Sequence, residues 1–337
     1  MGRLAVLLGM TKHPSTPLSR RRDVRVVIAV LAVVTLAVLF LRQPTLSSSY
    51  VAHSHASAER LRQEVTALSA TSRCDDDPDS LNRVAASIEN ELRATGARVS
   101  VQPFDADGNH YRNVIAAFGP DDGGELTIVG AHYDAFCLTG ILPGADDNAS
   151  GTAGLLELAR LLGRERGLRH PIALVFYATE EPPFFASENM GSAVHAKSLG
   201  NRKAHAIVLE MIGCFTEKSG LTGLFGLLYP RRGDFIAVIG RVQDIALTRA
   251  VKRGMSASGP VVSFNGMAEG VDASDQRSYW LSGHHAVMVT DTAYLRNPRY
   301  HTASDTAGTL DYPRMARVVD GVLNALLLAD AARTSGR

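Results

Sequence analysis

Residues 129 to 151, VGAHYDAFCLTGILPGADDNASG, join an apolar strand to the small residues that open a helix. Between strand and helix lie a His-x-Asp pair, His132 and Asp134, and an Asp-Asp-Asn triplet that begins at Asp146. Polar groups at the end of a strand lie at the carboxyl edge of a sheet, where open α/β folds place their sites. Imidazole and carboxylate are ligands of zinc-class divalent ions, so the stretch indicates a metal site, although the same residue types also populate turns.

Three further apolar runs lead to acids or to a histidine, as a convergent site requires. They are residues 171–179 before Glu180 and Glu181, residues 206–209 before Glu210, and residues 286–289, whose following segment carries His301. Any one of these ends could be a solvated loop. An ordinary strand end does not need carboxylates, so four such ends together predict a single site at one edge of the sheet.

Strands and helices alternate along most of the chain, which predicts one α/β domain with a mixed, mostly parallel central sheet and helices on both faces. Asp-Gly and Gly-Gly turns favour hairpins among the first strands, which we expect at residues 98–104, 112–118 and 125–131. Helical spacing covers residues 59–68, 81–95, 150–166 and 312–331, with Asp79 or Ser80 as the N-cap of the second helix. Residues 220–234 are Gly-rich and aperiodic, and form either a surface connection or a loop over the site.

The composition is that of an ordinary globular protein. The chain has 337 residues, of which 45% are hydrophobic and 20% charged, and a formal net charge of +1. This balance gives no indication of a nucleic-acid partner, and nothing in the sequence predicts an oligomeric state. Cys74, Cys137 and Cys214 are too few for a disulfide framework. A bridge from Cys74 to either of the others suits a location outside the cytosol, and we expect at least one buried free thiol.

The N-terminal region has the charge pattern of a membrane anchor. A basic segment, residues 1–25, precedes an uncharged apolar run, residues 26–41, and a linker at residues 42–58. Sixteen helical residues span about 24 Å, which approaches the ~30 Å hydrocarbon core if the flanking arginines extend to the interfaces. No small-x-small cleavage site follows at once, so we favour an uncleaved signal-anchor transmembrane helix over a signal peptide. The basic flank puts the N-terminus in the cytoplasm and residues 59–337 in the periplasm or extracellular space, or in secreted form if the anchor is cleaved.

The residue types at the four strand ends suit hydrolysis of an amide. Metal ions lower the pKa of water and polarise a carbonyl, while a carboxylate that binds no metal serves as general base. Asp134 lies too close to His132 to be needed as a ligand, so we expect it to accept the second ring N–H and fix the tautomer. One aspartate can bridge two metals about 3.5 to 4 Å apart. The residues alone do not separate Asp146 from Asp147 in that role.

Five motifs, HYD, GADDNASG, ATEEPPFF, LEMIG and RYHTASDT, occur in this order along the chain. In order and spacing they resemble the aminopeptidase Y, or leucyl aminopeptidase, type of di-zinc metallopeptidases, whose relatives include glutamate carboxypeptidase and glutaminyl cyclase. The resemblance covers roughly residues 85–330. It implies a zinc-exopeptidase fold of the phosphorylase/hydrolase kind, two Zn2+ per chain and peptide substrates.

Carried over by position, the resemblance assigns each strand end a role. Five residues would be metal ligands: His132 and Glu210 on one zinc, Glu181 and His301 on the other, and Asp147 as the bridge. Glu180 would be the general base for a metal-bridging hydroxide, with Asp134 supporting His132. The peptide bond between Asp147 and Asn148 resembles one that is cis in the family.

Other residues near the motifs have two interpretations. Tyr300 could donate to a tetrahedral oxyanion or pack against its neighbours, and Asp291 and Asp305 could orient His301 or cap turns. Gln276 stands where similar sequences would have a His, which affects substrate contacts only. The remaining histidines of interest have no partner motif and are expected to be solvated or structural: His110, His284 and His285.

Three functions remain open at this stage. The first is a membrane-anchored zinc aminopeptidase that hydrolyses N-terminal peptide bonds, without a decision against carboxypeptidase or dipeptidase action. The second is a single-zinc glutaminyl-peptide cyclotransferase, against which the five-ligand set argues. The third is a catalytically silent, receptor-like ectodomain similar to that of the transferrin receptor, and the intact ligand set argues against it too.

Overall fold

The computed structural model describes residues 17–46, 51–52, 55–137, 140, 142–266 and 270–332. It divides into two compact units, Met1–Phe40 and Leu41–Arg337, which are described separately. Helix α1, Pro17–Arg42, lies in the first unit except for its last two residues, which belong to the second. Its segment Val24–Arg42 is the one described helix long and apolar enough to cross a membrane, and none of that segment is buried within the structure. The predicted apolar run lies inside this helix, which starts earlier than the run.

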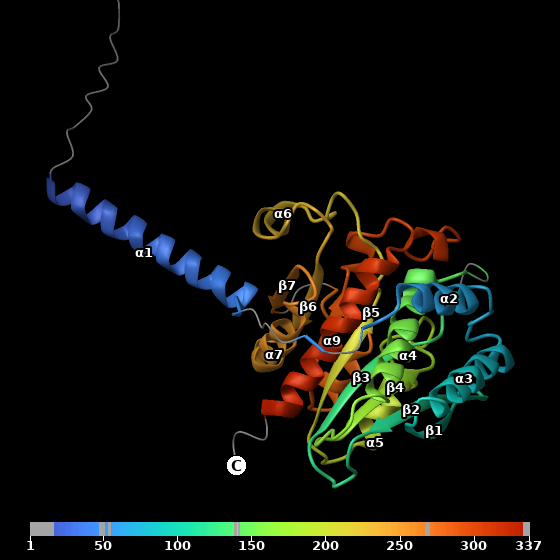
Figure 1. Cartoon of the computed structure of the whole chain (residues 1–337). Coiled ribbons are helices and arrows are strands. Elements are labelled where there is room, and N and C mark those ends of the chain that lie inside the picture. Colours follow the sequence, from blue (N-terminus) through green and yellow to red (C-terminus); the bar gives the residue numbers. More distant parts are fainter. Residues whose placement is uncertain are drawn as a thin grey trace, which may run out of the picture. The chain divides into compact units, whose positions relative to one another are not determined.

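The second unit is built on an eight-stranded sheet with the order β1-β2-β4-β3-β5-β8-β6-β7 (Figure 1). The strands are β1 Arg98–Ala106, β2 Asn109–Phe118, β3 Leu126–His132, β4 Ile172–Tyr177, β5 Ala204–Glu210, β6 Ile236–Gly240, β7 Val261–Asn265 and β8 His285–Thr290. The neighbours β4 and β3, β3 and β5, β5 and β8, and β6 and β7 are parallel, and the other three pairs are antiparallel. The predicted mixed, mostly parallel sheet is confirmed.

The parallel centre of the sheet brings the predicted strand ends to one edge. His132, the last residue of β3, lies in register with Tyr177, the last residue of β4. Glu210 ends β5 in register with Thr290 of β8. Glu180 and Glu181 follow β4 within four residues, so their backbone leaves the sheet at the same edge.

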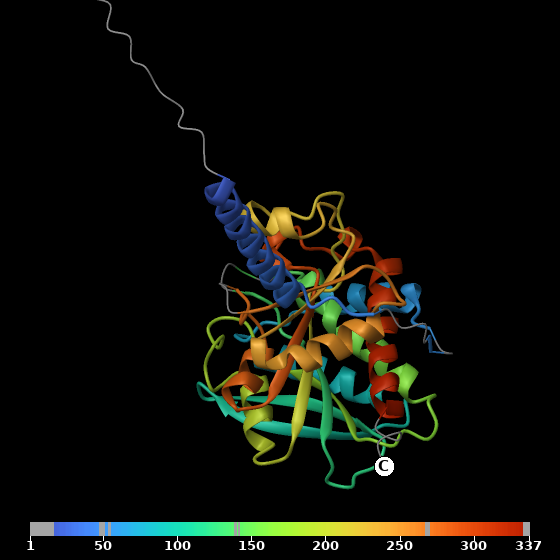
Figure 2. The same ribbon diagram turned by 90° about the vertical axis from the view of Figure 1, so that its left-hand side faces the viewer.

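Helices cover both faces of this sheet (Figure 1). Alternate residues of β4 enter different apolar cores, Leu174 and Phe176 on one face and Ala173 and Val175 on the other, as a strand buried on both faces requires. The larger core is completed by α2 Ala58–Ser69, α3 Pro78–Arg93, α4 Gly151–Leu162 and α9 Tyr312–Ala332, and the smaller by α5 Gly191–Ser198 and α8 Gln276–Leu281. Helix α7, Ile245–Met255, packs against α9 (Figure 2).

Three local predictions need correction. Helix α3 begins at Pro78 and is capped by Asp77, whose side chain accepts the N–H of Ser80 at 3.0 Å, because proline suits the first helical turn. The expected hairpin from β2 to β3 does not form, since β4 lies between them and pairs antiparallel with β2 and parallel with β3. Residues 220–234 are not wholly irregular, because they contain a short helix, α6 Gly223–Leu228.

Candidate metal centre

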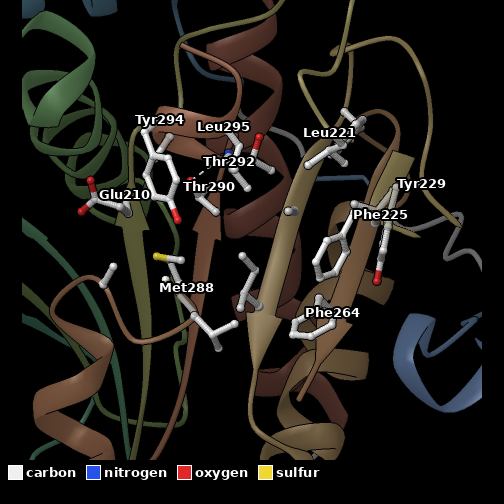
Figure 3. A pocket seen from close by; sticks show the side chains of 18 of the residues that line it. Glu210, Leu221, Phe225, Tyr229, Phe264, Met288, Thr290, Thr292, Tyr294 and Leu295 are labelled. Atoms are coloured by element: carbon white, nitrogen blue, oxygen red, sulfur yellow. Dashed lines mark hydrogen bonds between the residues drawn. The ribbon is translucent and has the colours of Figure 1, made fainter. Parts of the chain in front are cut away.

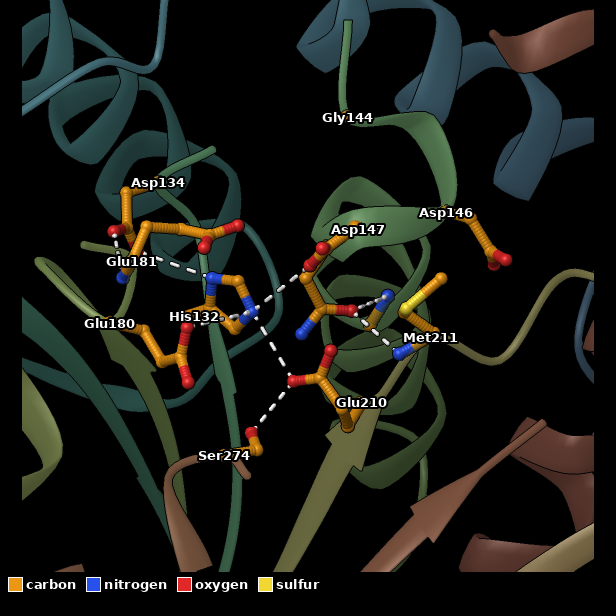
Figure 4. A network of polar contacts seen from close by, with 12 residues as sticks. His132, Asp134, Gly144, Asp146, Asp147, Glu180, Glu181, Glu210, Met211 and Ser274 are labelled. Carbon is orange, nitrogen blue, oxygen red and sulfur yellow. Dashed lines mark hydrogen bonds and ion pairs between the residues drawn. The ribbon is translucent and has the colours of Figure 1, made fainter. Parts of the chain in front are cut away.

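Two groups of ligand-type side chains meet at the carboxyl edge of the sheet and share Asp147. Figure 4 shows the group that contains His132. One group is His132, Asp147 and Glu210, the other is Asp147, Glu181 and His301, and the ligand atoms within each lie within 4.8 Å of one another. His132 Nε2 is 3.2 Å from Glu210 Oε2 and 3.5 Å from Asp147 Oδ1. His301 Nε2 is 3.1 Å from Asp147 Oδ2 and 3.4 Å from Glu181 Oε2. The two oxygens of Asp147 therefore face different histidines, as those of a bridging carboxylate would.

The donor set fits two divalent cations. His132 Nε2, His301 Nε2 and Glu181 Oε1 are buried and make no hydrogen bond within the described part of the chain. Buried polar atoms are nearly always paired, so two ring nitrogens 3.1 to 3.5 Å from carboxylate oxygens, together with an orphaned carboxylate oxygen, point to cations as their partners. Imidazole nitrogen and carboxylate oxygen are the ligands of zinc sites with positions left for water or substrate.

Burial and crowding shift the pKa values of the cluster. Burial, reinforced by Asp147, raises the pKa of Glu181 to about 8. Burial also raises the pKa of Glu180 well above its usual range, even though His132 opposes the shift. For His301, burial lowers the pKa, but Asp147 and Glu181 outweigh it and raise the pKa to about 9. Bound cations would offset this mutual repulsion of the carboxylates.

Glu180 lies beside the two groups without belonging to either. Its Oε2 is 3.9 Å from His132 Nε2, and its side chain is buried. Glu181, Glu210 and a further buried acid, Asp275, raise the pKa of Glu180 more, in that order. Neither carboxylate oxygen of Asp275 has a hydrogen-bond partner among the described residues. Asp275 precedes Gln276 in the SDQRSYW segment, but sequence reasoning considered only the glutamine. Gln276 itself donates to the carbonyl of Val271 at 2.9 Å, within its own segment.

Asp134 and Thr152 position His132. The ring Nδ1 is 3.2 Å from Asp134 Oδ1, and Asp134 Oδ2 accepts the backbone N–H of Glu181 at 2.9 Å. The Thr152 hydroxyl donates to the carbonyl of His132 at 2.7 Å. Asp134 thus lies where its proposed support of the ring requires, and it also fixes the strand end that carries Glu181.

Two aromatic rings sandwich His301. Phe136 stacks on one side, with ring centroids 3.9 Å apart and planes 12° apart, and Tyr300 on the other at 3.7 Å and 18°. Of the two interpretations of Tyr300, packing is the one that these contacts support. Phe136 comes from the same short stretch as His132 and was not predicted, because a single aromatic in a loop gives no sequence signal of its partner.

Distant segments hold the turn that carries Asp147. The carboxylate of Asp305 accepts the backbone N–H groups of Asp146 and Asp147, each at 3.1 Å, so it caps this turn rather than contacting His301. The bond between Asp147 and Asn148 is cis, as the resemblance implied. The Asn148 side chain bonds three backbone groups, donating to Leu209 and accepting from Gly151 and Met211.

Arg73 is a supporting residue that sequence reasoning missed. Its buried guanidinium donates to four carbonyl oxygens, those of Tyr133, Asp134, Pro143 and Gly144, at 2.6 to 3.3 Å. It therefore ties the segment after His132 to the turn before Asp147. Its neighbour Cys74 forms a disulfide with Cys137, which resolves the open pairing, and Cys214 is the buried free thiol.

Asp146 points away from both histidines into a separate cluster. Its carboxylate accepts from the Asn297 side chain at 2.7 Å and from the N–H of Gly213 at 3.0 Å, and it interacts with Asp291. Asp291 accepts the N–H of Cys214 at 2.7 Å. Every partner here is a protein group, so the structure separates two adjacent acids that the residue types alone could not.

The other histidines considered lie outside the two ligand groups: two of them pair with acids, and the Nε2 of the third, His284, has no hydrogen-bond partner among the described residues. His110 pairs with Asp105 at the surface. His285 Nδ1 contacts Asp244 at 2.7 Å. His284 is buried and its ring packs edge-on against Tyr279.

An apolar pocket of about 130 Å³ opens beside the candidate metal centre (Figure 3). Glu210 and Tyr300 line it on the side of the centre. The remaining wall is mostly apolar and includes Leu221, Phe225 and Phe264. The pocket thus offers a mostly apolar space that reaches Glu210 of one ligand group.

The sequence matches the profile described as Peptidase family M28 over residues 113–326. That span contains every residue of the two ligand groups. The chain belongs to peptidase family M28. Peptidases of this family typically use zinc, in agreement with the donor set described above.

Individual relatives agree with this M28 assignment. "Uncharacterized protein YfbL" of Escherichia coli is 45% identical over 313 residues, with 88% of this chain and 96% of that protein covered. A "Probable leucine aminopeptidase" of Trichophyton verrucosum is 27% identical, and the match covers 72% of this chain but only 62% of that protein.

Among solved structures, LapB from Legionella pneumophila has a TM-score of 0.64 at 20% identity, covering 81% of this chain and 72% of that one. Glutaminyl cyclase from Porphyromonas gingivalis has a TM-score of 0.63 at 21% identity, covering 82% and 100%. At such identities the two structures show a shared fold only.

Two features outside the candidate metal centre bear on where the chain is located. An apolar N-terminal helix, whether signal or anchor, suits an exported protein. The Cys74–Cys137 disulfide belongs to an oxidising compartment. Together they indicate a location outside the cytoplasm.

Proposed function

We propose that this chain is a zinc-dependent aminopeptidase that hydrolyses N-terminal peptide bonds. The observation that carries the proposal is the pair of His and carboxylate groups that share Asp147 while Glu180 stands in neither group. His132 and Glu210 would hold one zinc, Glu181 and His301 the other, and Asp147 both. When bound, the two metals would lower the pKa of a water molecule and polarise the peptide carbonyl.

The protein's own residues would then orient the reactants and move the proton. Glu180 would accept a proton from the attacking water at its carboxylate and pass it to the leaving amine. Its burial favours this role, because an environment that raises the pKa of a carboxyl group brings it closer to the working pH of a general base. Asp134 would keep His132 in one tautomer, and the Phe136 and Tyr300 rings would hold the plane of His301.

The apolar pocket supports a preference for apolar N-terminal residues. Among the described residues, its wall carries no charged group other than Glu210, which belongs to the metal centre in this proposal. A charged side chain placed there would lose its hydration without gaining a partner. Leucyl and phenylalanyl substrates should therefore be favoured over glutamyl and lysyl ones.

The location and topology follow from the N-terminal region. Helix α1 would span the membrane as an uncleaved anchor, since the 19 residues of Val24–Arg42 reach about 28 Å. The basic residues before it would stay in the cytoplasm, and the second unit would work outside.

A panel of peptides tests the reaction. The full chain, with zinc supplied, is assayed on aminoacyl anilides and on a leucyl peptide with a free or an acetylated N-terminus. We expect hydrolysis of the free N-terminus alone, loss of activity with a chelator, and recovery when zinc is restored. Release of the C-terminal residue from the acetylated peptide would instead show carboxypeptidase action.

The same panel includes a peptide that begins with glutamine. Ring closure of that glutamine without hydrolysis of any anilide would replace the aminopeptidase proposal with cyclotransferase action. A chain that binds no metal and transforms none of these substrates would be a receptor-like ectodomain.

A further inference from the structure

Helix α6 lies at the outer edge of the second unit (Figure 1). One of its faces is apolar and exposed. Leu224 is 66% exposed and Leu227 is 78% exposed. They are three residues apart and therefore lie on the same side of the helix. Phe225 has a different task, because it lines the apolar pocket and packs edge-on against Phe264 at 5.6 Å (Figure 3). The pocket thus explains why the inner side of α6 is apolar. It does not explain the exposed leucines on the outer side.

The composition around α6 does not suit a helix that faces water. Residues 219–230, SGLTGLFGLLYP, contain no charged side chain. A surface helix normally turns polar residues outward, and exposed apolar clusters mark contact surfaces. Two exposed basic residues, Arg231 and Arg232, follow immediately. An apolar face bordered by arginines is the pattern of segments that lie in the lipid interface.

Arg42, the last residue of the apolar span, belongs to the second unit and is bonded there to residues near α6. The carbonyl of Arg42 accepts hydrogen bonds from Lys252 Nζ at 2.9 Å and from the Ser263 hydroxyl. The Arg42 guanidinium lies 5.7 Å from the ring centroid of Tyr229. Tyr229 directly follows α6, and two residues of chain put the Cα of Leu227 within about 7 Å of the Cα of Tyr229. Because Arg42 is the last residue of the apolar span, a bilayer that contains the span has its surface at Arg42, and therefore close to α6.

We propose that the outer face of α6 inserts into the surface of the bilayer that α1 spans, with Leu224 and Leu227 among the acyl chains. Arg231 would lie at the anionic headgroups, and Arg232, which also pairs with Glu217 and Asp234, would lie beside it. The proposal rests on the anchor part of the proposed function and is independent of the peptidase reaction. It also places the Phe225 side of the apolar pocket next to the lipid surface.

Lipid contact can be measured at single positions in the full chain. Leu227→Cys is labelled with an environment-sensitive fluorophore and reconstituted into phosphatidylcholine and phosphatidylglycerol liposomes, with a spin-labelled acyl chain as quencher. Leu281→Cys in α8 is the matched control, because Leu281 is also apolar and is 74% exposed. The unsubstituted chain controls for labelling of Cys214, which is buried. We expect the label at position 227 to be quenched at least severalfold more strongly than the label at position 281.

The outcomes distinguish failure of the docking proposal from failure of the anchor proposal on which it rests. Equal quenching at positions 227 and 281 in a chain that floats with the liposomes would refute the docking and leave the anchor intact. A chain that does not float with the liposomes would refute anchor and docking together. The label at position 227 could instead be protected from water without being quenched by lipid, and only when each vesicle holds several chains. That result would show that a second copy of the chain covers this face, and it would also refute the docking. Peptide hydrolysis on the same liposomes reports separately on the reaction.

Discussion

Asp146 and Asp147 are adjacent and both buried, yet their carboxylates lie in opposite kinds of polar environment. Asp146 accepts hydrogen bonds from Asn297 and from the backbone of Gly213, so protein groups satisfy it. Asp147 faces the ring nitrogens of His132 and His301 at 3.5 and 3.1 Å, and those nitrogens make no hydrogen bond in the described structure. Burial is common to both clusters, and each contains a carboxyl group with a raised pKa, Asp146 in the first and Glu181 in the second. What distinguishes the candidate metal centre is the group of unsatisfied donor atoms, not the burial of acids.

The largest difference is expected between Asp147→Asn and Asp146→Asn. The first removes the charge shared by both ligand groups, so zinc content should fall and peptide hydrolysis should drop by more than about a thousandfold, as expected when metal activation and base catalysis fail together. The second leaves the ligands in place but weakens a hydrogen-bonded pair, which should lower the free energy of unfolding by about 1 to 3 kcal/mol. Elemental analysis and urea unfolding measure the two effects. If Asp146→Asn loses the zinc and Asp147→Asn keeps it, the assignment of Asp147 as the metal ligand and Asp146 as a structural residue is wrong.

Glu180→Gln tests whether an acid outside both ligand groups does the proton transfer. Hydrolysis should fall about a hundredfold to ten-thousandfold while zinc content stays at the wild-type level. Glu188→Gln is the control, since Glu188 is an exposed acid of the same loop. Near-normal turnover in Glu180→Gln would remove the general-base assignment, and loss of zinc would make Glu180 a ligand instead.

The disulfide should stabilise both clusters equally, because it constrains the whole chain rather than one carboxylate. Cys74 and Cys137 are 63 residues apart, and closing such a loop contributes roughly 4 kcal/mol to the free energy of unfolding. We expect Cys74→Ala with Cys137→Ala to unfold at markedly lower urea concentration but to bind zinc under native conditions. A loss of zinc in the folded double variant would show instead that the bridge positions the metal centre directly.

Ser274→Ala should have the smallest effect. Its hydroxyl donates to Glu210 Oε2 at 2.7 Å, and removing one such bond costs about 0.5 to 1.5 kcal/mol. Zinc affinity, measured by competition with a chromogenic chelator, should therefore fall roughly two- to tenfold. Ser304→Ala, at an exposed serine, should leave the affinity unchanged. An unchanged affinity in Ser274→Ala would mean that Glu210 is positioned without its help.

The sheet and the strand ends could be predicted because their signals are local. Apolar runs that end in acids are visible in the sequence, and parallel pairing then brings His132 and Glu210 to one edge. Pairing order is not local, which is why β4 between β2 and β3 escaped prediction. Helix α6 was missed because six residues are too few for a helical period to be recognised.

The supporting residues of the site could not be predicted for a related reason. Arg73 acts through four carbonyl groups that lie 60 to 71 residues away, and Ser274 acts on Glu210 64 residues away. The contribution of Arg73 and Ser274 to the site depends on tertiary packing, and neither residue belongs to one of the five motifs. The choice of Asp147 over Asp146 required the resemblance to known peptidases, and only the hydrogen bonds of Asp146 supply a physical reason for it.

The central claim is that Asp147 joins two metal positions. It is tested most directly by titrating the metal-stripped full chain with zinc while following both bound zinc and hydrolysis of a leucyl anilide. The account predicts two equivalents of zinc per chain in the wild type, full activity only when both are bound, and two equivalents in Asp146→Asn. A wild-type chain that saturates at one zinc, or that cleaves the anilide equally well without metal, would contradict it.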